Sequence, residues 1–328
     1  IQRKLQVNEK LYEFLLEKRA NTSIAKSGII PQTKIIERAR TIGVIWGKNN
    51  QNIFLFVGIG FIISLLFSIL QKMFFEKISD LNQLVDNSNI PVVGGLALLN
   101  EDKKFLDINF KSKSYFIESL RIIRTSINFL LTEQKENNSR FKSFLITSIH
   151  PGEGKTFTTL NLARIFAASG KKVLVVDFDM HKPKVHKVLN IKNDVGNSTN
   201  LSQKTKFSSS CQQIEENLHV ITSGPVPPNP SELVLSSSVL EMMKYAEQNF
   251  EYLFIDTPPI GYITDALVLS SFVDHSIFVM NTKFANNKGI KYLEDISNKS
   301  NIKSKALILN GVKKKRWKYY YGKYGYGY

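Results

Sequence analysis

The sequence predicts an α/β protein with a doubly wound, mostly parallel β-sheet and flanking helices. From about residue 112, short apolar runs alternate with helix-like segments, a glycine-rich turn links one run to a helix, and acidic residues directly follow two other runs. Short runs without polar residues are typical of strands buried on both faces, and alternation with helices favours parallel pairing. Ligands of such sheets bind beyond the carboxyl ends of the strands.

The composition is that of a folded chain with a strong positive charge. The 328 residues are 43% hydrophobic, carry a formal net charge of +16 and include one cysteine, Cys211. This hydrophobic content argues against disorder, and a single cysteine excludes a disulfide within the chain. Nucleic acid, anionic lipid and nucleotide are all compatible with the charge. The basic residues are scattered, with one dense run at 313–318, so we expect no nucleic-acid partner.

The first expected element is a helix before residue 30. Apolar residues recur at helical spacing between Val7 and Leu15, and Gly28 and Pro31 end the pattern. A helix with so narrow an apolar stripe usually packs against a partner helix. Because the chain starts at Ile1 without an initiator methionine, we expect it to be the C-terminal portion of a longer protein.

An uncharged apolar run at 53–70 predicts a membrane-spanning helix. At about 1.5 Å per residue it covers about 27 Å, close to the hydrocarbon thickness of a bilayer. Trp46 lies just before the run, where interfacial aromatic residues are common. A buried core helix is the alternative. The flanking basic residues leave the orientation of this helix open.

The remaining elements follow in order along the chain. Residues 76–89 are polar and predict a linker. The expected helices and strands after it are a helix at 114–131, a strand at 142–149, a helix at 156–169, and strands at 171–177, 252–256, 275–281 and 305–310.

The loop between the strand at 142–149 and the next helix has the features of a phosphate-binding site. It reads TSIHPGEGKTFTTLN at 147–161. Glycines let its amides face phosphates, Lys155 is expected to reach the β- and γ-phosphates, and Thr156 to ligate magnesium. Ile149 departs from the common pattern, which has Gly or Ala there, and a junction without a ligand is the alternative. We expect nucleotide contacts from Gly152, Glu153, Gly154, Lys155, Thr156 and Phe157.

Three carboxylates follow two predicted strands. Asp177 and Asp179 end VLVVDFD, and Asp256 ends YLFID before two prolines. Residues two apart on an extended chain point to the same side, so these side chains are expected to face one magnesium-phosphate centre. We interpret Asp177 as the general base, and Asp179 and Asp256 as ligands that position Mg²⁺ with Thr156. A role as helix caps or turn residues is the alternative.

The chain ends in KKKRWKYYYGKYGYGY. The interleaved glycines predict an exposed segment without regular structure, which an active site can accept. The alternative is an aromatic tail that binds polymer or RNA by stacking. The candidate phosphoryl acceptors are Tyr319, Tyr320, Tyr321, Tyr324, Tyr326 and Tyr328.

Together these segments resemble bacterial protein-tyrosine kinases of the P-loop type, fused to a polysaccharide chain-length regulator or co-polymerase. PGEGKT resembles their Walker A motif, VVDFDM their additional Walker A′ motif and LFIDTPP their Walker B motif. GPVPPNPSEL at 224–233 is similar to a loop typical of these kinases, and the terminal tyrosines resemble their autophosphorylation cluster.

The resemblance implies further contacts. Glu118, Arg121 and Arg124 match an E-x-x-R-x-x-R pattern that in the family forms contacts between subunits of a ring, and this spacing puts them on one helical face. A solvated charged face is the alternative. His181 stands where the family usually has Arg. Lys182 beside it carries a positive charge, but it cannot make the paired, bidentate hydrogen bonds that an arginine guanidinium makes.

The resemblance also implies how the chain is organised and where it lies. We expect a bacterial inner-membrane protein whose kinase domain is cytoplasmic. The expected parts are the end of an extracytoplasmic coiled-coil domain at 1–50, a transmembrane helix at 51–75, a juxtamembrane linker at 76–111, a kinase domain at 112–312 and a tyrosine-rich tail at 313–328.

The implied function is transfer of the ATP γ-phosphoryl group to the tail tyrosines, with Mg²⁺, between subunits of a ring-shaped homo-oligomer. The implied role is regulation of exopolysaccharide or capsule polymerisation and export, with a polymerase or export machinery and a tyrosine phosphatase as partners. A scaffold whose nucleotide site only controls assembly is one alternative. A partition-type ATPase is another, but those proteins typically carry a lysine at the position of His150.

Overall fold

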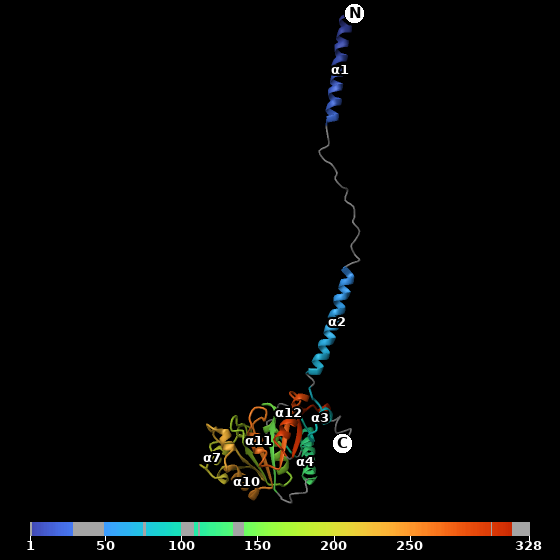
Figure 1. Cartoon of the computed structure of the whole chain (residues 1–328). Helices are drawn as coiled ribbons and strands as arrows, with labels where there is room; N and C mark the ends of the chain where they lie inside the picture. The colour runs from blue at the N-terminus through green and yellow to red at the C-terminus, as the bar shows by residue number, and fades with distance from the viewer. Residues whose placement is uncertain are drawn as a thin grey trace. The chain divides into compact units, whose positions relative to one another are not determined.

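The computed structural model describes residues 2–28, 49–74, 77–99, 108–110, 112–133, 141–302 and 304–316 (Figure 1). The chain divides into two compact units, 1–68 and 69–328. The six tail tyrosines and Trp46 lie outside the described residues.

The N-terminal part of the chain is helical. Helix α1 spans Gln2–Gly28 and helix α2 spans Asn49–Phe74, so both predicted helices are confirmed. The side chains of α1 from Arg3 onward are exposed. Within the described part of the chain, Asn52–Gln71 is the single helical stretch long and apolar enough to cross a membrane, and none of it is buried in the protein.

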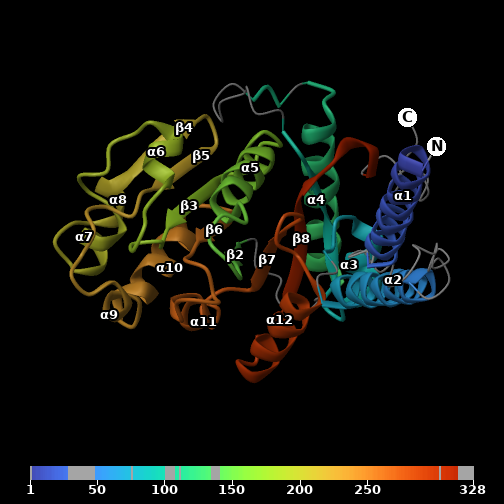
Figure 2. The same cartoon turned by 90° about the horizontal axis from the view of Figure 1, so that it is seen from above.

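The second unit is built on an eight-stranded sheet, seen from above in Figure 2. The strands lie in the order β1-β8-β7-β2-β6-β3-β5-β4, and every neighbouring pair is parallel except β4 with β5 at one edge. The predicted α/β fold is therefore confirmed. The strands are β1 (Val92–Ala97), β2 (Lys142–Ser148), β3 (Val173–Asp177), β4 (Cys211–Glu215), β5 (Leu218–Ile221), β6 (Tyr252–Asp256), β7 (His275–Asn281) and β8 (Lys305–Val312).

Helices cover both faces of this sheet, and each face has its own apolar core. Phe144 and Leu145 are neighbours in β2 but belong to different cores, because successive side chains of a strand point to opposite faces. Helices α4, α5 and α6 cover the Phe144 face, and α3 and α7 to α12 contribute to the other (Figure 2). These helices are α3 (Leu81–Asn87), α4 (Tyr115–Glu133), α5 (Lys155–Ala167), α6 (Val185–Leu189), α7 (Asn197–Leu201), α8 (Phe207–Ser210), α9 (Pro230–Val234), α10 (Ser238–Asn249), α11 (Asp265–Leu269) and α12 (Asn287–Lys299).

The structure corrects the prediction of a linker at the start of the second unit. Helix α3 is capped by Asp80, which accepts a hydrogen bond from the Gln83 backbone at 3.0 Å, and it buries Leu81 and Leu84. Strand β1 then pairs with β8. The prediction of a linker over 76–111 is therefore wrong for the residues of α3 and β1, which belong to the folded unit. The other predicted elements match α4, β2, α5, β3, β6, β7 and β8 to within two residues at each end.

Candidate active site

The phosphate loop connects β2 to α5 and depends on two glycines. Gly152 and Gly154 have φ of +87° and +90°, a left-handed conformation that other residues rarely adopt. A Cβ on Gly154 would collide with the side-chain amide of Asn310, at the end of β8. That amide donates a hydrogen bond to the Glu153 carbonyl at 2.9 Å. Sequence reasoning missed Asn310, which fixes the loop from a distant strand.

Two residues of the predicted nucleotide-contact run turn their side chains into the protein. Glu153 is 1% exposed, and its carboxylate accepts the His150 backbone N–H at 2.8 Å. Burial raises the pKa of Glu153 to about 7. The ring of Phe157 packs against Phe116, with centroids 5.6 Å apart. These side chains support the loop, so we expect both residues to contact the nucleotide through their backbone groups and not through their side chains.

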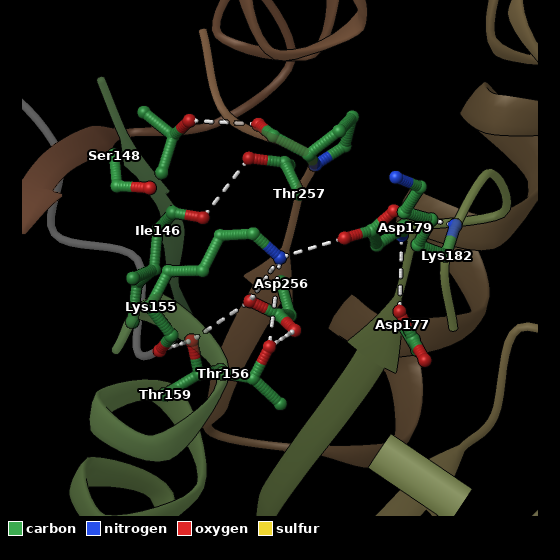
Figure 3. Close-up of polar contacts among 12 residues, drawn as sticks. Ile146, Ser148, Lys155, Thr156, Thr159, Asp177, Asp179, Lys182, Asp256 and Thr257 are labelled. Carbon is green, nitrogen blue, oxygen red and sulfur yellow. Dashed lines mark hydrogen bonds and ion pairs between the residues drawn. The ribbon is translucent and has the colours of Figure 1, made fainter. Parts of the chain in front are cut away.

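Lys155 lies at the centre of a buried charge cluster (Figure 3). Its Nζ is 2.8 Å from Asp179 Oδ2 and 3.8 Å from Asp256 Oδ1. Burial opposes the lysine charge, but the carboxylates of Asp256 and Asp179 outweigh it and raise the pKa of Lys155. The ammonium is thus held protonated where the phosphate loop begins its helix.

Asp256 also accepts hydrogen bonds from the first turn of α5. The Thr156 hydroxyl donates to Asp256 Oδ2 at 2.6 Å. Thr159 donates to the other oxygen at 3.4 Å and to the Lys155 carbonyl at 2.9 Å. The hydroxyl predicted to ligate magnesium therefore already faces a strand-end carboxylate.

Asp177 is the most buried carboxylate of the cluster, with no measurable exposure. Its Oδ1 accepts the Asp179 backbone N–H at 3.0 Å, while Oδ2 has no hydrogen-bond partner among the described residues. Burial and the neighbouring Asp256 raise its pKa well above the usual range for a carboxyl group. Asp177 Oδ2 is therefore a buried carboxyl oxygen that makes no hydrogen bond within the described residues and lies in the charge cluster around Lys155.

The residues present fit a nucleotide with Mg²⁺. In the described part of the chain no set of three or more His, Cys, Asp or Glu side chains is arranged to hold a metal alone. A magnesium ion would therefore be held by the Thr156 hydroxyl, the carboxylates of Asp179 and Asp256 and phosphate oxygens together.

Comparisons with known proteins give the family. An AAA domain family matches residues 142–307. The tyrosine-protein kinase YwqD of Bacillus subtilis is 38% identical over 218 residues, which cover 65% of this chain and 87% of YwqD. The solved kinase domain of the Escherichia coli tyrosine kinase ETK superposes with a TM-score of 0.64 at 27% identity, over 71% of this chain and 94% of that domain. The chain belongs to the bacterial tyrosine-protein kinases.

The longer members of this kinase family extend beyond the chain. The tyrosine-protein kinase wzc of Salmonella typhimurium is 27% identical over 345 residues, which cover 99% of this chain but 47% of wzc. The chain thus spans about half the length of that relative. Membership confirms the predicted P-loop fold, the enzyme class of protein-tyrosine kinase, and ATP with Mg²⁺ as cofactors.

Two residues of this kinase depart from the motif pattern, His181 and Ile149, and each contacts a different part of the structure. His181 replaces the usual Arg, and its Nε2 lies 3.1 Å from Asp265 Oδ2, on a carboxyl side chain that is 2% exposed. Lys182 uses its backbone N–H, which donates to Asp179 Oδ1 at 3.1 Å. Ile149 is 6% exposed and its carbonyl lies against Gly261, where a Cβ would be 2.5 Å away. Each departure therefore has a local partner.

The three residues of the E-x-x-R-x-x-R pattern lie on α4 of this kinase and make contacts within the chain. Glu118 Oε2 is 3.1 Å from Arg121 Nη1, and Arg121 also donates to the Phe110 carbonyl at 3.1 Å. Arg124 donates to the Ile165 carbonyl at 3.2 Å. Glu118 and Arg121 stay well exposed, at 41% and 36% of their side chains. The predicted role of these residues in subunit contacts stays a prediction.

Proposed function

We propose that this chain transfers the γ-phosphoryl group of ATP to tyrosines of its own C-terminal tail, with Asp177 as the general base. The observation that carries the proposal is the unpartnered, buried Asp177 Oδ2 in the cluster that holds Lys155. Membership of the bacterial tyrosine-protein kinases supports tyrosine as the acceptor.

In this mechanism each residue of the cluster has one task. Asp177 Oδ2 accepts the phenol proton as the tyrosine oxygen forms its bond to the γ-phosphorus and the bond from that phosphorus to the β,γ-bridging oxygen breaks, so that ADP leaves. Lys155 neutralises charge on the β- and γ-phosphates, and Gly152 and Gly154 turn backbone amides toward them. When bound, Mg²⁺ supplies further charge neutralisation, held by Thr156, Asp179 and Asp256.

We further propose that transfer occurs between subunits of a ring. The described start of the tail supports this, because the Lys314 ammonium lies 4.5 Å from the ring centroid of Tyr115, the first residue of α4. The same helix carries Glu118, Arg121 and Arg124, the predicted subunit-contact residues. A tail that leaves beside this contact surface is well placed to enter a neighbouring subunit.

The proposed location is the bacterial inner membrane, with α2 as the anchor, the kinase unit cytoplasmic and residues 1–50 extracytoplasmic. The length and apolar composition of Asn52–Gln71 support the anchor, and the need for ATP supports the orientation. The proposed role is control of exopolysaccharide or capsule polymerisation and export, with a polymerase or export machinery and a tyrosine phosphatase as partners. This role rests on the resemblance to kinases fused to a chain-length regulator.

Mixing two variants tests the activity and its direction. A Lys155→Met chain with an intact tail is combined with an active chain that ends at residue 312, together with ATP and Mg²⁺. We expect phosphotyrosine on the Lys155→Met chain, and formation at least about 10²-fold slower when the truncated donor also carries Asp177→Asn. An unphosphorylated Lys155→Met chain would contradict transfer between subunits. If the unmodified chain also forms no phosphotyrosine while it still binds ATP, the assembly scaffold is favoured.

A further inference from the structure

A basic pocket of ≈ 430 Å³ lies where the Walker A′ segment leaves the reaction centre. Lys182, Lys184, Lys187 and His186 line it, and none of its lining residues is acidic. The three lysines are exposed and have no ion pair among the described residues. Several unpaired ammonium groups around one hollow favour an anionic ligand.

The wall of the pocket that contains Asn193 is held in place by contacts between the Asn193 side chain and the Gly224 backbone. Asn193 donates to the Gly224 carbonyl at 2.8 Å and accepts the Gly224 N–H at 2.9 Å. Gly196 approaches Gly224 so closely that a Cβ on Gly196 would collide with the Gly224 backbone. Val226, next along this wall, is 61% exposed and lines the pocket. The pocket is therefore preformed and has an apolar side as well as a cationic one.

The pocket is connected directly to the reaction centre. Lys182 lines the pocket, and its backbone N–H donates to Asp179 Oδ1, while the other carboxylate oxygen of Asp179 binds Lys155 (Figure 3). Phosphotyrosine made at the reaction centre would therefore arise near this pocket. A phosphate ester on an aromatic ring matches both sides of it, with the phosphate at the lysines and the ring against Pro183 and Val226.

The charge of the tail decides when it can bind. Residues 313–328 contain six Lys or Arg residues, six tyrosines and no acidic residue. The unmodified tail is therefore repelled by a lysine-lined pocket. Each phosphorylation adds a charge of about −1.5 to −2 at one tyrosine, so the attraction to the lysines is local to the phosphate group and is absent before transfer, while the tail as a whole stays positive after one phosphorylation.

We propose that this pocket is a docking site for phosphotyrosine of the tail, which holds a tail after its first phosphorylation and promotes further transfer to the same tail. The proposal rests on the proposed tyrosine-kinase function. It assigns Lys184 and Lys187 to product recognition, separate from the cluster around Lys155.

Binding can be measured without turnover. The full chain is treated with phosphatase, kept free of nucleotide and titrated with a labelled synthetic peptide of residues 317–328, either unmodified or phosphorylated on Tyr324. We expect the phosphopeptide to bind at least about tenfold more tightly, because charge-assisted hydrogen bonds to phosphate are strong. Lys184→Glu with Lys187→Glu removes this difference, whereas Lys204→Glu with Lys206→Glu, another exposed lysine pair, preserves it.

A second assay compares phosphoryl transfer to the two peptides. We expect faster transfer to the phosphopeptide, with this advantage lost in the Lys184→Glu/Lys187→Glu chain and transfer to the unmodified peptide retained. Equal binding of the two peptides, or a phosphopeptide preference that survives the double substitution, overturns the docking site. Loss of binding to phosphatidylserine vesicles without loss of phosphopeptide binding also overturns it, in favour of a lipid contact. Absence of any transfer contradicts the kinase function. The peptide titration still tests the proposed docking site in that case, because it measures binding without turnover.

Discussion

Asp177 and Asp256 stand directly opposite each other in the register of β3 and β6. Both side chains are almost completely buried, with 0% and 1% exposure. Burial raises the pKa of both carboxyl groups, and the proximity of the two raises that of Asp177 further. The pairing therefore produces one carboxylate held by Lys155 and Thr156 and a second with high proton affinity.

The role of Asp177 can be separated from the stability of the cluster. Asp177→Asn keeps the shape of the side chain but removes the proton acceptor. We expect phosphotyrosine formation to slow by about 10²- to 10⁴-fold, the usual contribution of a general base, with ATP affinity nearly unchanged. The melting temperature should not fall, because a buried carboxyl beside another carboxyl is removed. Transfer at the original rate would refute the base assignment.

The Thr156 hydroxyl is expected to determine the magnesium requirement. Thr156→Ala removes the group that lies 2.6 Å from Asp256, whereas Thr156→Ser retains it. We expect the Mg²⁺ concentration for half-maximal activity to rise by about tenfold or more in the alanine variant, since one oxygen ligand is lost, and to change little in the serine variant. Thr158→Val is the matched control, because the buried Thr158 hydroxyl has no partner among the described residues. Similar titrations for Thr156→Ala and Thr158→Val would exclude Thr156 as a ligand.

Glu153 should make the stability of the domain depend on pH. Its pKa is raised to about 7 in the folded chain from the usual value of 4.5, so the folded state binds a proton that the unfolded state has released. The free energy of unfolding therefore falls as pH rises from about 4.5 through about 7, by about 3 kcal/mol at 1.36 kcal/mol per pKa unit.

Glu153→Gln tests this pH dependence. Glutamine is neutral at every pH, so we expect denaturant unfolding of the variant to show a flatter profile over that range. The raised pKa values of Asp177 and Asp256 leave a residual slope of the same sign in both proteins. Identical profiles for the two proteins would show that Glu153 does not titrate there.

Gly154 and Gly170 provide a matched pair for the strain in the phosphate loop. Both have positive φ, +90° and +84°, but a Cβ on Gly170 meets open space, whereas one on Gly154 meets Asn310. Gly170→Ala should cost about 1 kcal/mol of stability, from the left-handed conformation alone. Gly154→Ala should cost more and also lose ATP affinity. Equal effects in thermal unfolding and nucleotide binding would show that the contact with Asn310 is unimportant.

The strands around the site were predictable because burial on both faces leaves an unbroken apolar run. Strand β1 was missed although it is also apolar. Its centre holds Gly94 and Gly95, and glycine weakens a strand pattern. The structure explains Gly95: the Leu81 side chain occupies the space that a Cβ would need. This close packing depends on α3 and cannot be read from local sequence.

The residues of the candidate site also divide into those that could be predicted from the sequence and those that could not. Lys155, Asp177 and Asp256 were predictable because each lies at the junction of a strand or helix with a loop. Asn310 carried a usable signal, since it follows the apolar run of β8, but its contact with Glu153 spans 157 residues. The inward orientation of the Glu153 side chain depends on burial, which the sequence of the loop does not specify.

The pairing of β1 with β8 also determines when the sheet can be completed during synthesis of the chain. Strand β1 is an edge strand whose one neighbour in the described sheet is β8, the last of the described strands. About 200 residues separate the two, which at ≈ 5–20 residues per second means about 10 to 40 seconds of synthesis. During that interval the ribosome has made α2 but not the partner of β1. The tyrosine-rich segment follows β8 immediately, so the proposed substrate is made directly after the strand that completes the described sheet.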